Sequence, residues 1–401
     1  MTSDMSDCPT CRTHPANLLG CERLPVAVAR LPPTDLEAPM PRRKTDRTSS
    51  FPSLPYLPRD PHSYRPKIGL IGCGAITSYH LKAYRAAEYE VVALCDVNRE
   101  AAEKRREEYY ANAAIFTDHK ELLNLKSVDV VDVTTHPEVR VALIEDALRA
   151  GKHVLSQKPF VLDLDTGQRL ADLADKQGVL LAVNQNGRWA PHFSYIREAV
   201  RAGLVGEVVG VHCGVHWDHS WVRGTQFEKV RDLILYDFAI HWFDFLTTVM
   251  GDTRAQRVFA SATPSTTQEV APPLLGQAVV EYENAQASLI FDGHVPRGSW
   301  DRTLVTGNSG IIRAAGVDLS SQRLEIITDD GIVSPKLEGT WFPDGFHGTM
   351  GELLCAIEDD REPSHSARNN LRSLELCFAA VASSQSHEPV VPGTVRKLPD
   401  T

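Results

Sequence analysis

Residues 67–77 read KIGLIGCGAIT, and this stretch decides the fold of the first half of the chain. The apolar run 67–71 predicts a buried β-strand, and helix-like sequence follows the two glycines. Gly72 permits a tight turn at the end of the strand, and Gly74 lets the backbone approach a pyrophosphate closely. The stretch therefore predicts a strand–turn–helix unit that binds a dinucleotide. Thr77 in the third position of the pattern predicts looser packing of the helix on the strand.

The start of the helix and a later aspartate complete this predicted site. The backbone N–H groups of Ala75 and Ile76, with the positive end of the helix dipole, are expected to bind the pyrophosphate. Asp96 stands 22 residues after Gly74, where a carboxylate accepts hydrogen bonds from ribose hydroxyls. Such a carboxylate repels a 2′-phosphate, so we expect NAD rather than NADP unless Arg99 turns inward and offsets its charge. The alternative is a two-glycine turn followed by a helix-capping aspartate.

The rest of the first half alternates short apolar runs with amphipathic stretches. The predicted strands are 91–95, 128–133, 153–156 and 180–183, and the predicted helices include 99–110 and 138–150. Strands that alternate with helices of this length favour right-handed crossovers and a parallel sheet. We therefore expect residues 65–185 to form a doubly wound Rossmann domain that binds NAD(P).

Length and composition exclude several classes of protein. With 401 residues, of which 42% are hydrophobic and 23% charged, the chain has the size and character of two globular domains. The net charge of −10 argues against a nucleic-acid partner, and no apolar run is long enough to suggest a membrane span. The eight cysteines are scattered and do not form a disulfide framework, so we expect a cytoplasmic protein.

Residues 1–64 differ from the rest of the chain. They hold 11 of the 25 prolines and a single glycine, without helical period or strand alternation. Such a segment cannot bury enough surface to offset the entropy of ordering it, so we expect a disordered Pro-rich tail, or residues upstream of the true start. Cys8 and Cys11 have the spacing of half a zinc site, but an accidental pair is favoured because no second ligand pair stands at a usable distance.

The second half, residues 186–401, predicts a different architecture. Candidate strands follow one another without intervening helices at 208–213, 257–262, 278–282, 287–291, 303–306 and 324–327. This arrangement favours an α+β domain built on a mostly antiparallel, open β-sheet. An amphipathic helix is predicted from residue 367 to about 385.

Three blocks in order along the chain carry a family resemblance. Residues 147–159 read ALRAGKHVLSQKP, residues 186–191 read NGRWAP, and residues 237–244 read DFAIHWFD. Together they resemble the Gfo/Idh/MocA oxidoreductases, the glucose–fructose oxidoreductase and inositol dehydrogenase group, from about residue 66 to the end. The resemblance implies that the open sheet covers the nicotinamide face of the cofactor site and that it often builds dimers or tetramers.

The resemblance also implies cofactor contacts, and the sequence departs from the family pattern at three of the places concerned. The implied contacts are Thr135, His136, Gln157, Lys158 and Asn186. Gln157 replaces the usual glutamate, so the charge that a glutamate lends the nicotinamide pocket is missing. Arg140 aligns with a histidine that the family often carries, and the turn 135–137 reads Thr-His-Pro in place of Thr-Pro-Asn.

Three residues are candidates for the chemistry. Lys158 follows a predicted strand, and ligands of an open parallel sheet bind at the carboxyl ends of its strands. Its ammonium is suited to hydrogen-bond a substrate oxygen and stabilise a developing alkoxide. His241 is suited to accept or return the proton, and Asp237, four residues earlier on a predicted helix, is suited to orient it or to share the proton path. The alternatives are a surface lysine and a hydrogen-bonded core histidine.

Substrate contacts are predicted on two segments. Arg188 and Trp189 are suited to clamp and stack on a polyhydroxylated ligand, although packing at a domain junction is equally compatible with their sequence context. Residues 212–221 hold three histidines and two tryptophans, including His216 and Trp217. We favour a substrate loop over a metal site here, because strand alternation splits the cluster between two faces and hydride transfer needs no metal. His347 is a further candidate for this loop.

These observations predict an NAD(P)-dependent dehydrogenase that transfers a hydride between nicotinamide and a hydroxyl carbon of a sugar, polyol or cyclitol. We expect a small-molecule carbohydrate substrate and a homo-oligomer, without nucleic-acid or membrane partners. Two alternatives remain. One is a glycosidase that uses bound NAD for transient oxidation, and the other is a non-enzymatic nucleotide-binding regulatory protein.

Overall fold

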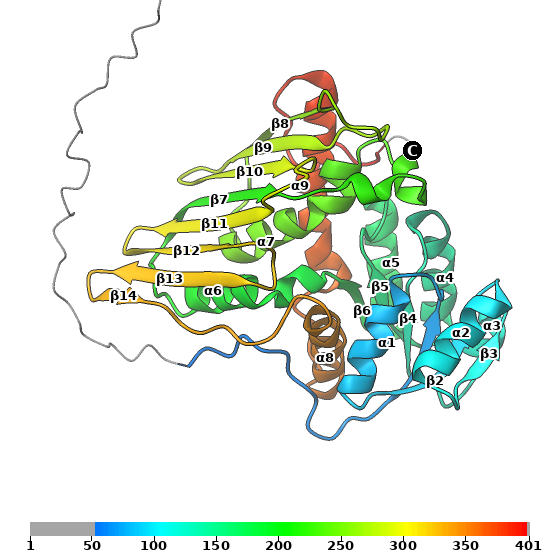
Figure 1. Cartoon of the computed structure of the whole chain (residues 1–401). Helices are drawn as coiled ribbons and strands as arrows, with labels where there is room; N and C mark the ends of the chain where they lie inside the picture. Colours follow the sequence, from blue (N-terminus) through cyan, green and yellow to red (C-terminus); the bar gives the residue numbers. More distant parts are fainter. Residues whose placement is uncertain (1–52, 399–401) are drawn as a thin grey trace, which may run out of the picture. The chain divides into compact units, whose positions relative to one another are not determined.

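The first sheet is parallel and places the carboxyl ends of its strands at one edge. The structure is a computed structural model that describes residues 53–398, and in this range the strands form two sheets (Figure 1). The first has the order β3-β2-β1-β4-β5-β6. Its strands are β1 (Lys67–Ile71), β2 (Glu90–Cys95), β3 (Ala114–Phe116), β4 (Val130–Val133), β5 (His153–Gln157) and β6 (Leu181–Asn184). The predicted doubly wound Rossmann sheet is confirmed. Only the three-residue, partly exposed β3 escaped the sequence pattern.

Helices cover both faces of this sheet. The helices of the first half are α1 (Thr77–Ala86), α2 (Arg99–Tyr109), α3 (His119–Leu123), α4 (Pro137–Arg149) and α5 (Leu164–Gln177). On one face, α3, α4 and α5 share an apolar cluster with the side chains of Val131 and Val133. On the other face, α1 packs with Leu70 and Leu155, and there it is joined by α8 (Asp344–Glu358) from the far end of the chain.

The second sheet has one face packed on helices and one open face. Its order is β14-β13-β12-β11-β7-β10-β9-β8, in which only the neighbours β7 and β10 run parallel. Its strands are β7 (Val208–His216), β8 (Arg257–Thr263), β9 (Leu275–Glu281), β10 (Gln286–Asp292), β11 (Trp300–Gly307), β12 (Gly310–Gly316), β13 (Gln322–Thr328) and β14 (Gly331–Val333). The predicted open, mostly antiparallel sheet is confirmed, and β12 and β14 are additions to it.

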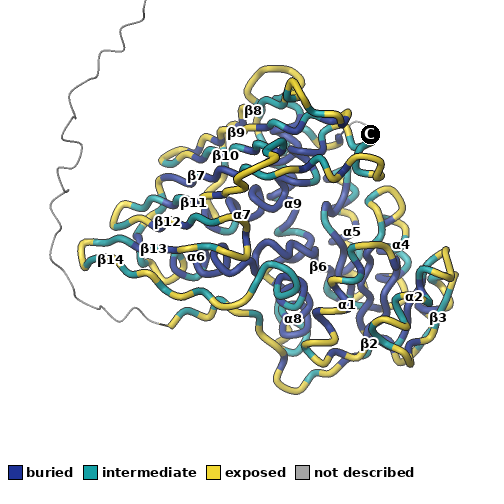
Figure 2. The backbone as a smooth tube through the Cα atoms, in the orientation of Figure 1, coloured by how far each residue is buried: buried dark blue, intermediate teal, exposed yellow. Residues whose placement is uncertain are grey.

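Three long helices and several short turns connect the two sheets. The helices are α6 (Pro191–Arg201), α7 (Ile240–Met250) and α9 (Ala367–Ser386), and the short elements are η1 (Asn186–Trp189), η2 (Ser220–Val222), η3 (Gln226–Lys229) and the π-helical η4 (Ile234–Phe238). α9 contacts β8 of the second sheet as well as α5 and β6 of the first, and it is largely buried (Figure 2). None of the helices within residues 53–398 combines the length and apolar character that crossing a membrane requires.

The helix α8 was missed by the sequence pattern because it carries three glycines in two turns. Gly345, Gly348 and Gly351 lower helix propensity by about 1 kcal/mol each relative to alanine. Each lies where another segment approaches closely. A β-carbon at Gly348 would overlap the indole of Trp189, and one at Gly351 would overlap the backbone carbonyl of Arg59. Close packing, rather than propensity, therefore determines the composition of this helix.

A buried ion pair fixes the junction between the two halves. Arg188 of η1 donates to both carboxylate oxygens of Asp244 on α7, from Nε at 2.6 Å and from Nη2 at 2.7 Å. Its remaining donors reach the carbonyl of Ser364 and the side chain of Asn369 at the start of α9. Because both partners are almost completely buried, the pair is screened little by solvent and holds three segments together.

The described part of the predicted tail is packed against the folded chain. The carboxylate of Glu358 at the end of α8 accepts backbone N–H bonds from His62, Ser63 and Tyr64 at 2.6, 2.6 and 2.8 Å. The ring of Tyr56 lies edge-on to Tyr195 of α6. The expectation of a loose tail up to residue 64 therefore needs correction for residues 53–64, because hydrogen bonds and ring contacts offset the cost of ordering them. Cys8 and Cys11 lie outside the described residues.

We expect Glu358→Ala to lower the melting temperature at pH 7, measured by circular dichroism. The backbone N–H bond from Ser63, with those from its neighbours, lowers the pKa of the Glu358 carboxyl from 4.5 to about 2. Because the folded-state pKa is depressed, this stabilisation is complete above about pH 4.5 and is lost as the pH falls toward 2. The difference in melting temperature should therefore shrink in that window. Glu107→Ala, at an exposed position of α2, is the control, and an equal decrease in both variants would contradict the contact.

We expect Asp244→Ala to reduce the free energy of unfolding by about 3–5 kcal/mol, because it leaves the buried Arg188 guanidinium without a counter-charge. Urea denaturation measures this change. Glu281→Ala, which breaks an exposed pair with Arg257, serves as the control and should cause a far smaller loss. If the two variants unfolded at similar urea concentrations, the buried pair would not be what holds the junction together.

Candidate active site

One cavity connects the glycine turn of the first sheet to the helices of the second half. Its volume is about 1000 Å³, and it extends from Gly74 at the start of α1 to Lys158 after β5 and His241 on α7. The segment between β7 and α7 forms its opposite wall. The cavity thus lies at the carboxyl edge of the parallel strands, where open α/β sheets bind ligands.

The glycine turn has the geometry that the sequence predicts. Gly72 has a φ of +101°, which L-residues with a β-carbon rarely adopt, and a β-carbon there would overlap Thr135. Nothing lies within 4 Å of the β-carbon position at Gly74, so the backbone there is open to a ligand. Thr77 corrects the prediction of looser packing: it is fully buried, and its hydroxyl donates to the carbonyl of Gly72 at 2.8 Å. Thr134 donates to the same carbonyl at 2.6 Å, so two hydroxyls hold the turn.

Asp96 stands directly beside this turn. One carboxylate oxygen accepts the backbone N–H of Cys73 at 2.7 Å, and the other accepts that of Asn98 at 2.8 Å. Arg99 does not turn inward, because it pairs with Glu103 one turn along α2 at 2.9 Å. The negative charge of Asp96 is therefore held next to the turn without a guanidinium from Arg99 to offset it.

A buried chain of hydrogen bonds orients the residue before Lys158. The side-chain oxygen of Gln157 accepts the backbone N–H of Lys158 at 2.6 Å, which leaves its amide nitrogen to donate to Nε2 of His80 at 3.1 Å. His80 must therefore carry its proton on Nδ1, which donates to Asp132 at 2.7 Å. Tyr84 donates to the same carboxylate oxygen at 2.7 Å. Sequence reasoning missed this network, although Asp132 within the apolar run of β4 was a signal of it.

Lys158, Asp237 and His241 line the same cavity, and the first two are in contact. Nζ of Lys158 lies 3.2 Å from a carboxylate oxygen of Asp237 and donates to the Asp237 carbonyl at 3.0 Å. Burial lowers the pKa of the His241 imidazole well below 6.5, and the positive charge of Lys158 lowers it further, so the ring is uncharged at neutral pH. Nδ1 of His241 has no hydrogen-bond partner among the described residues. Asp237 thus pairs with Lys158, which corrects the expectation that it orients His241. Asp237 belongs to a π-helical turn that ends at Phe238, whereas His241 belongs to α7, so the two residues do not share one regular helix.

The loop after β4 and the turn after β6 complete the floor of the cavity. Thr135, His136 and Asn186 line it together with Gln157 and Lys158. The Thr135 hydroxyl and the side-chain oxygen of Asn186 are buried without a hydrogen-bond partner in residues 53–398, and Ala75 and Ile76 line the end near α1. The predicted cofactor residues after β1, β4, β5 and β6 are therefore brought to one cavity, with Asp96 beside its glycine turn.

Three predicted ligand residues are placed elsewhere. Arg188 and Trp189 are only 4% and 7% exposed and do not line the cavity, because Arg188 is committed to Asp244 and Trp189 packs on α8. Their position matches the alternative of junction packing. His216 pairs with Asp292 at 2.7 Å and stacks on Trp300, on the open face of the second sheet.

Trp217, the residue after His216, lines the cavity, so of these two residues of the predicted substrate loop only Trp217 reaches it. The alternation along β7 thus divides the histidine–tryptophan cluster between two faces. His219, which belongs to the predicted substrate loop, also lines the cavity, and burial lowers its pKa to about 4. Sequence reasoning left Trp341 unassigned, a further wall residue whose ring lies edge-on to His241 at 5.3 Å. His347 does not join this wall but pairs with Asp60 at 2.8 Å.

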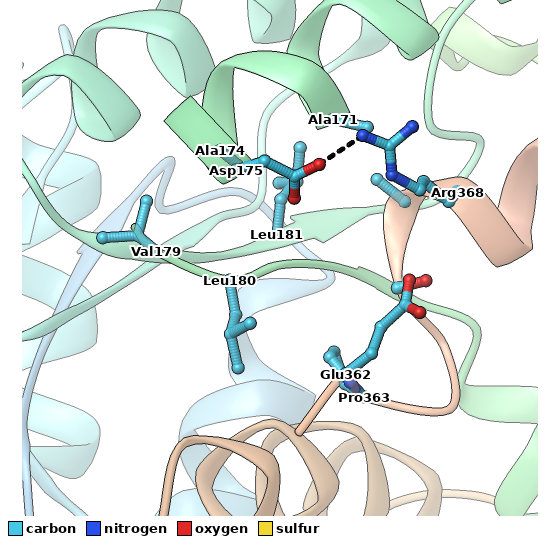
Figure 3. Close-up of a pocket in the computed structure, with 11 residues that line it drawn as sticks. Ala171, Ala174, Asp175, Val179, Leu180, Leu181, Glu362, Pro363 and Arg368 are labelled. Atoms are coloured by element: carbon cyan, nitrogen blue, oxygen red, sulfur yellow. Dashed lines mark hydrogen bonds and ion pairs between the residues drawn. The ribbon is translucent and has the colours of Figure 1, made fainter. Parts of the chain in front are cut away.

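A second hollow, between α5, β6 and the segment before α9, is too small for a cofactor or a sugar (Figure 3). Its volume is about 40 Å³, which holds only a few water molecules. Asp175 and Arg368 form an ion pair at its wall. Within the described residues, no cluster of three or more His, Cys, Asp or Glu side chains has an arrangement that could hold a metal ion.

Comparison with curated proteins identifies relatives over most of the chain. D-apiose dehydrogenase of Paraburkholderia graminis is 26% identical over 81% of this chain and 89% of its own. Inositol 2-dehydrogenase of Rhizobium meliloti is 26% identical over 79% of this chain and 96% of its own. The match thus spans both sheets.

Solved structures share the fold. An oxidoreductase of Agrobacterium radiobacter, solved with NAD+, L-tartaric acid and magnesium, superposes with a TM-score of 0.74 at 19% identity, over 82% of this chain and 99% of its own. Residues 66–185 match the model of an oxidoreductase family with an NAD-binding Rossmann fold, and residues 193–313 match the GFO/IDH/MocA C-terminal domain. With its glycine turn, its Gln-Lys-Pro segment and its second sheet, the chain belongs to the Gfo/Idh/MocA family of NAD-binding oxidoreductases.

Proposed function

We propose that this chain is an NAD-dependent dehydrogenase that oxidises a hydroxyl carbon of a sugar, polyol or cyclitol. The observation that carries the proposal is the single cavity that joins the glycine turn to Lys158, Asp237 and His241. The relatives named as D-apiose and inositol dehydrogenases support a polyhydroxylated substrate. The aromatic rings of Trp217 and Trp341 offer flat surfaces to its C–H groups.

The residues of the cavity fit a dinucleotide. The open backbone at Gly74 and the first amides of α1 suit a pyrophosphate, and the carboxylate of Asp96 suits ribose hydroxyls. The unpartnered Thr135 hydroxyl and Asn186 oxygen are available to the nicotinamide half. When bound, NAD supplies the acceptor for the hydride that leaves the substrate carbon.

Lys158 and His241 have different roles in the proposed reaction: the lysine stabilises negative charge and the histidine transfers the proton. Lys158 donates a hydrogen bond to the reacting oxygen and stabilises its negative charge, while Asp237 holds the lysine Nζ in place. His241, uncharged at neutral pH, accepts the hydroxyl proton as the C–H bond breaks. In the reverse direction the imidazolium returns this proton to the carbonyl oxygen as the carbon receives the hydride.

We further propose that residues 65–185 bind the cofactor and that residues 186–401 bind the substrate and form subunit contacts. The open face of the second sheet carries exposed apolar side chains, among them Phe259, Val279 and Ile311, which suits a homo-oligomer. The five cysteines of the described residues are all free and buried, which is compatible with the reducing environment of the cytoplasm.

A screen of aldoses, polyols and inositols with NAD+ and NADP+, in which the absorbance of the reduced cofactor is measured, tests the function.

We expect Lys158→Ala to lower kcat by about two to four orders of magnitude, because the charge on the reacting oxygen loses a hydrogen-bond donor. The affinity for NAD should change only a few-fold. Unaltered turnover would remove Lys158 from the mechanism. Release of an aglycone from glycosides without net NADH would instead indicate a glycosidase.

We expect Asp96→Ala to weaken NAD binding by about tenfold and NADP binding far less, because the carboxylate accepts ribose hydroxyl bonds from NAD and repels the 2′-phosphate of NADP. Isothermal titration with both dinucleotides measures the two dissociation constants. Equal losses for both would contradict the ribose contact. Glu107→Ala, which removes an exposed carboxylate on α2 and leaves the Arg99–Glu103 pair intact, is the control and should leave both constants unchanged.

A further inference from the structure

Arg140 is a buried cation without a carboxylate partner among the described residues. Its guanidinium donates to three backbone carbonyls, those of Thr135, Gln157 and Pro159, and it is 1% exposed. Burial lowers the pKa of Arg140 to about 10, which leaves the group charged at neutral pH. Arg140 thus ties the loop after β4 to the loop after β5, and it lines the cavity described above.

The other charges around the cavity leave that of Arg140 in excess. Lys158 and Asp237 form a pair of opposite sign, and the Asp237 carboxylate also acts on Arg140, so one buried negative charge faces two cations. The charged side chains of Glu138, Asp218 and Lys229 also line the cavity, but they are exposed, so solvent and salt screen them.

The uncharged and more distant groups do not cancel this excess. Burial keeps His241 and His219 uncharged, and the side chain of Gln157 is neutral. Asp132 is a buried carboxylate whose charge the uncharged His80 does not neutralise, but it does not line the cavity, and His80 and Gln157 stand between it and Lys158 in the hydrogen-bonded chain. The N-terminus of α4, three residues before Arg140, adds the positive end of its dipole.

This excess charge lies on the nicotinamide side of the site. In a sheet that switches direction between β1 and β4, a dinucleotide places its adenosine over β1 and β2 and its nicotinamide toward β4 and β5. Arg140 contacts the loops that follow β4 and β5. If the proposed function holds, the positively charged ring of NAD+ therefore lies on the side of the site that carries the Arg140 charge and is repelled by it, whereas the uncharged ring of NADH is not.

We propose that Arg140 sets the redox preference of the cofactor site, so that the protein binds NADH more tightly than NAD+. An electrostatic repulsion of about 1.4 kcal/mol between Arg140 and the oxidised ring changes the ratio of the two dissociation constants by about tenfold. For a two-electron couple, a tenfold ratio raises the potential of the bound cofactor by about 30 mV. The charge thus favours hydride transfer from the substrate to the cofactor while both are bound.

The test measures the dissociation constants of NAD+ and NADH on the full chain without substrate, by isothermal titration. We expect wild type to bind NADH about tenfold more tightly than NAD+, and Arg140→Gln to lower this preference by about tenfold. Arg140→Lys keeps the charge and should retain the preference within about twofold. Both constants come from the same preparation, so a reduced folded fraction in a variant does not alter their ratio.

Lys152→Gln is the matched control. Lys152 is also a buried cation held by backbone carbonyls, those of Leu125 and Val128, but it precedes β5, whereas Arg140 lies at the opposite end of that strand. Its removal should leave the ratio unchanged. Tighter binding of NAD+ than NADH by wild type, or equal ratios in Arg140→Gln and Arg140→Lys, would overturn the proposal. Failure of wild type to bind either dinucleotide would instead contradict the proposed cofactor site.

Discussion

The ion pair between Lys158 and Asp237 is the contact on which the site depends, because its partners come from different halves of the chain. Lys158 follows a strand of the parallel sheet, and Asp237 belongs to the π-helical turn that leads into α7. The turn carries the Asp237 carboxylate to the lysine and leaves His241 in a buried, uncharged state beside it. The buried Arg188–Asp244 pair fixes the same α7 to the segment after β6, so Asp244 of the junction and His241 of the proposed site lie on neighbouring turns of one helix.

Much of the first sheet was predictable because parallel strands have strong local signals. The run 67–71, the glycine turn and Asp96 lie in the structure as their spacing indicates. The elements that were missed have weak local signals: β3 is three residues long, and α8 owes its glycines to the close approach of Trp189 and Arg59. Helix propensity depends on the residues of the helix alone, whereas the glycines of α8 are required by contacts with Trp189 and Arg59, which are distant in the sequence. A single sequence does not reveal such contacts.

The site shows the same division between local and distant information. Lys158, Asp237, His241 and Trp217 reach the cavity, as their motifs indicate. Arg188 and Trp189 share a motif with Asn186, but one turn of η1 sends Asn186 to the cavity and the other two into the junction. The chain from Gln157 through His80 to Asp132 joins residues 25 to 77 positions apart, so only coordinates reveal that it orders the protons behind the lysine.

The position of α8 has a consequence for how the protein is made. One face of the Rossmann sheet is covered by α1 together with α8, whose residues 344–358 are translated about 160 residues after the last strand of that sheet. A nascent chain that has reached only β6 therefore lacks the helix that packs against α1 and β6 on this face. The apolar cluster there is completed only when residues 344–358 have left the ribosome.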